Sequence, residues 1–331
     1  MKNEIQSKLA LFAANAQAIR KDFTWHDTLV KKMAALLYAL DNRSIDCAAI
    51  RDSHTQIKNS TGVFSTFRGN MALCVATILS LKNRVDLFAH TMSVYEMLKN
   101  EKFRASDYLV VAAYEIASQA KPEEYGQVVT RTREFYDSMK SKGFFRIGQD
   151  DYIFSAMLGL SDIEVKAGTE RIEQLYQRFK PEFRSGNSVQ ALAQVLVLSG
   201  DCDTTINRIL TIRDMMKSQK IRLDKAYTLP SLGVLALLPV DVNTLVRDIE
   251  ESVAFLRAQK GFGSWSVDKQ ALLLFATAIV ASVYAKDIEN GAITASVSTS
   301  IASILIAQQA AIIAAVSASA AASAAAAASS G

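Results

Sequence analysis

Apolar residues recur along the chain with the three- and four-residue spacing of helices, and the pattern repeats in units of about forty residues. Within each unit, a first segment is amphipathic and a second is apolar on almost all sides. In residues 127–142, for example, Val128, Thr132, Phe135 and Met139 form one stripe, and the next segment, YIFSAMLGL, is almost continuously apolar. The pattern therefore predicts an all-α protein built from helix pairs.

A short step, usually Phe-Arg, separates the two helices of each pair and marks the repeat. The strict steps begin at Phe67, Phe103, Phe145, Phe183 and Ile221, and relaxed copies begin at Phe23 and Phe262. Residues able to cap a helix start follow the steps, and the candidates are Asn70, Asp107, Asp150 or Asp151, Asn187, Asp224 and Asp268. These intervals predict about seven helix pairs of roughly 40 residues, which form one domain over residues 1–289.

The apolar second helices need cover on most sides, so we expect them to form an inner layer beneath an outer layer of amphipathic helices. Such an array either extends into an open α/α superhelix or closes into an α/α toroid-like ring, and the sequence leaves both possible. Pro230 lies within the sixth apolar segment, AYTLPSLGVLALL, and predicts a kink in that helix.

The last part of the chain departs from the repeat, because residues 290–331 contain no charged side chain. We expect an apolar helix over 290–316 that caps the array, followed by a low-complexity Ala/Ser tail over 317–331. Membrane association through the apolar segment is the weaker alternative. A glutamine pair at Gln308 interrupts that segment, and no basic or aromatic anchors follow it.

Composition excludes several functions without indicating one. The 37 Lys and Arg residues are interleaved with 33 Asp and Glu residues, so a net charge of +4 gives little support to nucleic-acid binding. Three widely spaced cysteines without a C-x-x-C pair argue against a disulfide framework and a zinc knuckle. His26, His54 and His90 lie in different units, so we expect no metal site, and no cofactor motif is present. The expected compartment is the cytoplasm.

The arginines of the steps are the candidate binding residues. Equivalent positions in a stacked array fall along one edge, where the guanidinium groups could bind a phosphate, a carboxylate or an acidic protein segment. These residues are Arg68, Arg104, Arg146, Arg184 and Arg222. The plainer alternative, which we favour, is that each arginine bonds the carbonyl groups that end its own outer helix, or pairs with a nearby cap carboxylate.

Two patterns raise an enzymatic alternative. In a closed ring, the acids at the inner-helix starts would face a central cavity and could work as acid/base pairs. These acids are Asp107, Asp150, Asp151 and Asp268. The segment from Gln259 to Trp265 is similar to the Gln-Trp motif of terpenoid cyclases, where that motif is structural, so it supports no catalysis by itself. We therefore expect a non-enzymatic binding or scaffold protein, of an oligomeric state that the sequence does not fix.

Several long segments resemble one bacterial family, the domain of unknown function four thousand and three. They are FSTFRGNMAL, FRASDYLVVAAYEIA, QDDYIFSAMLGL, RSGNSVQALAQVLVL, AYTLPSLGVLALLPVDV, QKGFGSWS and ILIAQQAAIIAAVSASAAA. The resemblance covers nearly the whole chain, including the Ala/Ser tail. It implies a soluble, all-helical bacterial protein of one domain, and it brings no activity, substrate, cofactor or site residue.

Overall fold

The structure is a computed structural model that describes residues 1–24, 26–63, 65–69, 71–82, 86–142, 147–183, 186–199, 203–223 and 228–289. All regular elements in these ranges are helices, so the predicted all-α class is confirmed. The expected C-terminal helix and tail over residues 290–331 lie outside the described residues. The same holds for Arg146, Arg184, Asn70 and Asp224.

The described chain contains fourteen α-helices and four short 3-10 helices. The α-helices are α1 (Asn3–Ala18), α2 (Thr28–Leu40), α3 (Cys47–Ser60), α4 (Met71–Lys82), α5 (Leu87–Asn100), α6 (Asp107–Gln119), α7 (Tyr125–Ser141), α8 (Tyr152–Leu160), α9 (Val165–Phe179), α10 (Gly186–Leu198), α11 (Asp203–Ser218), α12 (Leu229–Leu237), α13 (Val242–Ala258) and α14 (Lys269–Glu289). The 3-10 helices are η1 (Ile19–Lys21), η2 (Thr66–Arg68), η3 (Pro122–Glu124) and η4 (Gln149–Asp151).

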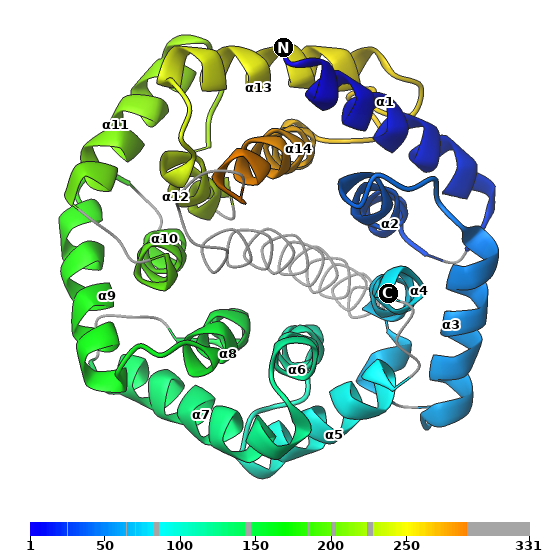
Figure 1. Ribbon diagram of the computed structural model, residues 1–331, viewed down its shortest axis with the longest axis vertical. Coiled ribbons are helices and arrows are strands. Elements are labelled where there is room, and N and C mark those ends of the chain that lie inside the picture. Colours follow the sequence, from blue (N-terminus) through cyan, green and yellow to red (C-terminus); the bar gives the residue numbers. More distant parts are fainter. Residues whose placement is uncertain are drawn as a thin grey trace, which may run out of the picture.

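The helices form two concentric layers around a common axis (Figure 1). Odd-numbered helices lie outside and even-numbered helices lie inside, as their polarity requires. In the outer helix α9, one stripe containing Ile172, Leu175 and Phe179 is buried while the opposite face meets solvent. In the inner helix α8, every residue from Tyr152 to Gly159 is buried. Apolar surface on all sides thus directs the second helix of each pair into the interior.

The first and last helices meet and close the ring of helices seen in Figure 1, because α1 packs against α13 and α14. Phe12 of α1 meets Phe262 and Phe275 edge to face, with ring centroids 5.1 and 5.2 Å apart. Within the last pair, the Tyr284 hydroxyl donates to the buried carboxylate of Asp248 at 2.6 Å. Buried aromatic contacts of this kind make the junction part of the core.

Basic side chains of three outer helices bind backbone carbonyls at, or up to three residues beyond, the carboxyl ends of the inner helices that follow them. Each reaches a backbone carbonyl 32 residues further along the chain: Lys8 that of Leu40, Arg131 that of Ile163, and Arg208 that of Val240. The last carbonyls of a helix lack partners within the helix and carry partial negative charge. A cation from the outer layer therefore satisfies them and ties the two layers together.

The structure corrects two local expectations and supports a third. Pro230 lies in the first turn of α12, which begins at Leu229, so it starts this helix and does not kink it. Ser106, and not Asp107, caps α6 by accepting a hydrogen bond from a backbone N–H three residues on. Asp268 does cap its helix, since its carboxylate accepts from two N–H groups of α14 at 2.7 and 2.8 Å.

Candidate functional site

Two of the five steps, at Phe103 and Ile221, directly follow the left-handed residue that ends an outer helix. Lys102 ends α5 in the left-handed conformation, with φ at 64°, and the N–H of Phe103 donates to the carbonyl five residues earlier at 3.2 Å. Lys220 and Ile221 repeat this geometry after α11, with φ at 59° and a bond of 2.8 Å. In such a motif the residue after the left-handed position packs an apolar side chain back onto the helix. This explains the apolar residue at these two steps, Phe103 and Ile221. The arginine that comes next lies where the chain leaves the outer helix.

Three of the five step arginines lie in the described part of the chain, in different environments. The guanidinium of Arg68 donates to the carbonyls of Lys58 and Thr61, and its Nε donates to the Thr61 hydroxyl at 3.1 Å. Arg68 thus binds the end of its own outer helix, α3. Arg104 and Arg222 are exposed. The backbone N–H of Arg104 donates to a tyrosine hydroxyl of α8 at 3.3 Å, which fixes the crossover from which its side chain extends.

A pocket of about 460 Å³ lies between the end of α3 and α5. We call it the Thr66 pocket. Its lining consists of residues 60–63 and 65–67 on one side, Met92, Tyr95, Glu96 and Lys99 of α5 on the other, and Ala105. Lys99 is the cation within the lining, and Arg68 and Arg104 are the sequence neighbours of the lining residues Phe67 and Ala105.

The Thr66 pocket is lined by both apolar and polar side chains. Tyr95 is buried, its ring meets Phe67 edge to face at 5.0 Å, and its hydroxyl lies 3.0 Å from the Thr66 hydroxyl. Burial raises the pKa of Tyr95, so this hydroxyl stays protonated at neutral pH. The exposed Lys99 ammonium pairs with Glu96 at 3.0 Å and lies 5.7 Å from the Tyr95 ring centroid. The pocket can therefore offer hydroxyl donors and a cation above aromatic surface.

A second polar group, which we call the Asp151 cluster, lies at the start of α8. Asp151 is only 7% exposed, and its carboxylate accepts from the Gly148 N–H at 2.9 Å and from the side-chain amides of Gln190 and Gln194 of α10. Burial, helped by the neighbouring Asp150 carboxylate, raises the pKa of Asp151 to about 7. The two glutamines join α8 to α10, and the raised pKa brings the titration of Asp151 toward neutral pH.

Three of the four acids expected to face a cavity lie close together. Burial raises the pKa values of Asp107 and Asp150, and burial together with the charges of Asp150, Asp107 and Asp151 raises the pKa of Tyr108 to about 12. Asp268, in contrast, is used as a helix cap. None of these acids lines the Thr66 pocket, so the acids and this pocket are two separate groups.

Sequence reasoning did not single out Glu115, a buried carboxyl within the inner helix α6. One of its oxygens accepts from the Gln119 amide at 2.7 Å, and the other has no hydrogen-bond partner among the described residues. Burial raises the pKa of Glu115 to about 7. The sequence did contain a signal for this buried group, because Glu115 is a carboxylate within the largely apolar segment DYLVVAAYEIA.

Two histidines that the sequence assigns to different units meet in the structure. The rings of His26 and His54 pack edge to face at 5.4 Å beside Phe23, and burial lowers the pKa of both. Within the described ranges, no group of three or more His, Cys, Asp or Glu side chains could hold a metal ion. In the segment that resembles the Gln-Trp motif, Gln259 bonds a carbonyl of its own helix and Trp265 is fully exposed.

The described chain is thus an all-helical protein whose candidate sites lie at the starts of its inner helices, and its helices include none long and apolar enough to cross a membrane. The family described as protein of unknown function (DUF4003) matches residues 15–310, and the chain belongs to this family. No curated protein and no solved structure matches the chain.

Proposed function

We propose that this chain is a helical-repeat protein with an α/α-toroid-like arrangement, and that it works in the cytoplasm by binding a ligand and not by catalysis. The binding surface is the face on which the inner helices begin. The observation that carries this proposal is the Thr66 pocket, whose volume of about 460 Å³ suits a small molecule. Its hydroxyl-rich wall and neighbouring cations favour a ligand that carries a carboxylate or phosphate group.

The step arginines extend this surface around the ring. Arg104 is the strongest candidate for ligand contact, because it is exposed and adjoins the lining residue Ala105. Lys99 supplies a second cation from the lining itself. Arg68 has a supporting role, since its donors are used on carbonyls at the end of α3. Arg146, Arg184 and Arg222 remain in the proposal as equivalent positions along the same edge.

The test measures the binding of inorganic phosphate by calorimetry. The ionic strength is held constant, and sodium chloride is the reference salt. Arg104→Glu should weaken phosphate binding at least tenfold, which is about 1.4 kcal/mol, because it replaces attraction by repulsion. Arg178→Glu is the matched control: this exposed arginine of α9 undergoes the same charge change away from the pocket. Equal affinities for both variants and the natural chain would remove the proposal.

The enzymatic alternative takes second place and rests on the Asp151 cluster. Asp151 does not cap α8, and its pKa of about 7 suits a group that exchanges protons at neutral pH. Its carboxylate oxygens are nevertheless occupied by Gly148, Gln190 and Gln194, which is what a structural link between helices requires. Turnover of a chromogenic ester, phosphate or glycoside that Asp151→Asn abolishes in a folded chain would reverse this order.

A further inference from the structure

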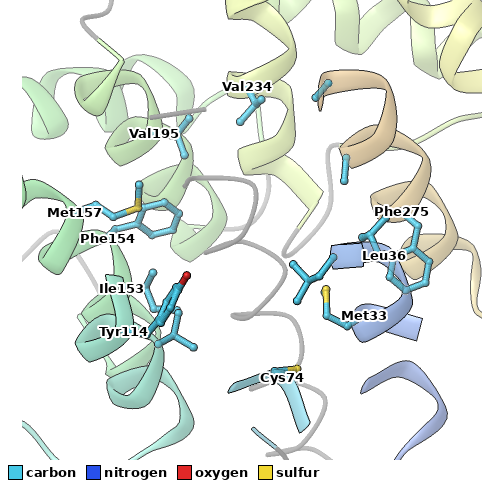
Figure 2. Close-up of a cluster of buried hydrophobic side chains, with 14 of the residues drawn as sticks. Met33, Leu36, Cys74, Tyr114, Ile153, Phe154, Met157, Val195, Val234 and Phe275 are labelled. Carbon is cyan, nitrogen blue, oxygen red and sulfur yellow. The ribbon is translucent and has the colours of Figure 1, made fainter. Parts of the chain in front are cut away.

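Two large apolar side chains of the described chain lie on the protein surface, unlike those of the inner helices. Met33, Phe154 and Val234, for example, are buried among other apolar residues (Figure 2). Val63 is 74% exposed and Trp265 is fully exposed. Both belong to crossovers that lead from an outer helix to an inner helix, from α3 to α4 and from α13 to α14. They therefore lie on the face of the ring where the inner helices begin.

These two crossovers lie on either side of the first crossover, which leads from α1 to α2. The side-chain amide of Gln17, near the end of α1, donates to the carbonyl of Lys260 in the last crossover. On the other side, the ring of Phe23 meets that of His54 in α3, with centroids 6.2 Å apart. The three crossovers thus form one continuous part of the ring. We call the exposed surface of residues 19–24, 26–27, 58–63 and 259–269 the crossover face.

The loop that carries Trp265 is anchored on both sides of the indole. Phe262 is buried, and its ring meets that of Phe12 edge to face at 5.1 Å. The guanidinium of Arg257 donates to the carbonyls of Phe262 and Val267 at 2.8 and 2.9 Å. These contacts hold the loop in one position while the indole projects from it. The fold therefore keeps Trp265 where a partner outside the chain can bury it.

Exposed basic side chains surround the two apolar residues on the crossover face. They are Arg20, Lys21, Lys58, Lys260 and Lys269. A basic residue in the last turn of a helix complements the helix dipole, which accounts for Lys58 of α3. Lys260 follows the end of α13 and Lys269 begins α14, so the dipole does not account for the two lysines that flank the indole in sequence. They supply positive charge beside Trp265.

The acids of the crossover face are engaged in contacts within the protein. Asp22 pairs with Arg51 at 2.6 Å, and Asp27 and Asp268 cap α2 and α14. The crossovers that lead back from inner to outer helices carry mostly acids among their charged residues, for example Asp41, Asp46, Asp162, Glu164 and Asp241. Charge of opposite sign is thus presented at the two ends of the ring. The end that carries the exposed apolar residues is the basic end.

We propose that the crossover face binds the surface of an anionic lipid bilayer without spanning it. An indole is amphipathic and is stable at the level of the lipid headgroups, and clustered Lys and Arg side chains are attracted to anionic lipids. A bilayer accepts apolar side chains that project from one face, whereas a protein partner needs a matching pocket for each. The proposal goes beyond the Thr66 pocket. Val63 lines that pocket and Trp265 does not, so substitutions of Trp265 test the lipid surface alone.

The first test is co-sedimentation of the full chain with vesicles of phosphatidylcholine, with and without phosphatidylglycerol. We expect binding only to the vesicles that contain phosphatidylglycerol, and weaker binding as sodium chloride is raised, because salt screens the attraction. Trp265→Ser should weaken binding about fivefold, since the indole is lost from the headgroup region. Lys21→Glu/Lys260→Glu should weaken it about tenfold or more, because it reverses two charges on the crossover face.

Two control variants separate the crossover face from general effects. Lys121→Glu/Lys166→Glu makes the same charge change on exposed residues at the other end of the ring and should bind like the natural chain. Trp265→Phe keeps an aromatic ring and should retain most of the binding. Failure of the natural chain to bind phosphatidylglycerol vesicles would overturn the proposal. Equal binding by Trp265→Ser and the natural chain, or equal losses in the two charge variants, would do the same.

A second test asks whether the indole of Trp265 enters the bilayer. Lipids brominated on their acyl chains quench nearby tryptophans, and the chain contains two tryptophans. Quenching by phosphatidylglycerol vesicles should be stronger in the natural chain than in Trp265→Phe, because the difference reports Trp265. Equal quenching would place the membrane contact elsewhere in the chain and contradict the proposal. Phosphate binding by calorimetry should be the same for Trp265→Ser and the natural chain, so the Thr66 pocket is judged separately.

Discussion

At the scale of single residues, the same side chain serves different purposes in different units. Arg68 binds the end of α3, whereas Arg104 extends from the protein surface. The difference follows from the local backbone: α3 ends in an extended residue, Thr61, and α5 ends in the left-handed Lys102. A repeated arginine in a sequence therefore predicts a repeated position but not a repeated contact.

The buried Glu115 makes stability depend on pH in a direction opposite to that of most carboxylates. Its pKa is about 7 in the folded chain and 4.5 when unperturbed, so between these values the folded chain binds more protons than the unfolded chain. Stability therefore falls as pH rises from about 4.5 to about 7 and then levels off. We expect Glu115→Gln to remove this loss, and to be more stable than the natural chain by on the order of 2 kcal/mol at pH 8.

Urea denaturation at pH 5 and pH 8 measures the effect, and the gain from Glu115→Gln should be much smaller at pH 5. Glu250→Gln, on the exposed side of α13, is the control and should give the same small change at both values. A gain from Glu115→Gln that does not vary with pH would contradict the assignment of a buried, protonated carboxyl.

At the scale of elements, helix ends determine how the layers are joined. After α5 and α11, a left-handed residue and the apolar residue that follows it turn the chain from an outer helix toward an inner one. The basic residues Lys8, Arg131 and Arg208 then bind the far ends of the inner helices. The two layers also depend on a glycine where α7 and α8 come close together. A Cβ on Gly159 of α8 would lie 2.5 Å from the Thr132 hydroxyl of α7.

Replacing one of the basic residues that bind across the two layers should lower the free energy of unfolding more than replacing an ordinary surface arginine. Arg131→Ala leaves three carbonyls without their partner, those of Gly159, Ser161 and Ile163. We expect a loss of about 2 to 3 kcal/mol in the free energy of unfolding, since hydrogen bonds to a charged donor are strong. Arg178→Ala removes an exposed ion pair of 3.8 Å and should cost less than about 1 kcal/mol. Equal costs in urea denaturation would show that the tie does not stabilise the fold.

At the scale of the whole molecule, closure makes the two ends of the chain depend on each other. Phe12 of α1 packs on Phe262 and Phe275, which lie about 250 residues away in sequence. In an open array the first and last pairs would each have one uncovered side and would fray independently. In a ring, α1 and α14 protect each other.

Phe12→Ala tests this dependence. We expect a loss of about 3 to 5 kcal/mol from the cavity left in the core. Hydrogen exchange followed by mass spectrometry should then quicken in α1 and equally in α13 and α14. Phe179→Ala, a comparable buried truncation in α9, is the control and should loosen α9 and its neighbours first. Faster exchange confined to α1 would contradict the closed junction.

The sequence by itself determined the helical class and the alternation of amphipathic with apolar helices. These properties follow from short-range spacing, because a helix face and a helix end are each defined within a few residues. The cap of α14 by Asp268 was also predicted correctly, because a cap is defined by the residues next to it. Two local predictions were wrong. Ser106, one residue before Asp107, caps α6 in its place, and Pro230 lies in the first turn of α12, where a proline causes no kink.

Tertiary structure alone decided which distant residues meet. The contacts of Phe12 with Phe275, of Asp151 with Gln190, and of His26 with His54 join different units, and their formation depends on how each helix pair is rotated against the next. A small rotation per pair accumulates around the array, so closure is a property of the sum and not of any one segment. The burial that shifts the pKa values of Glu115 and Asp151 exists only once those contacts have formed.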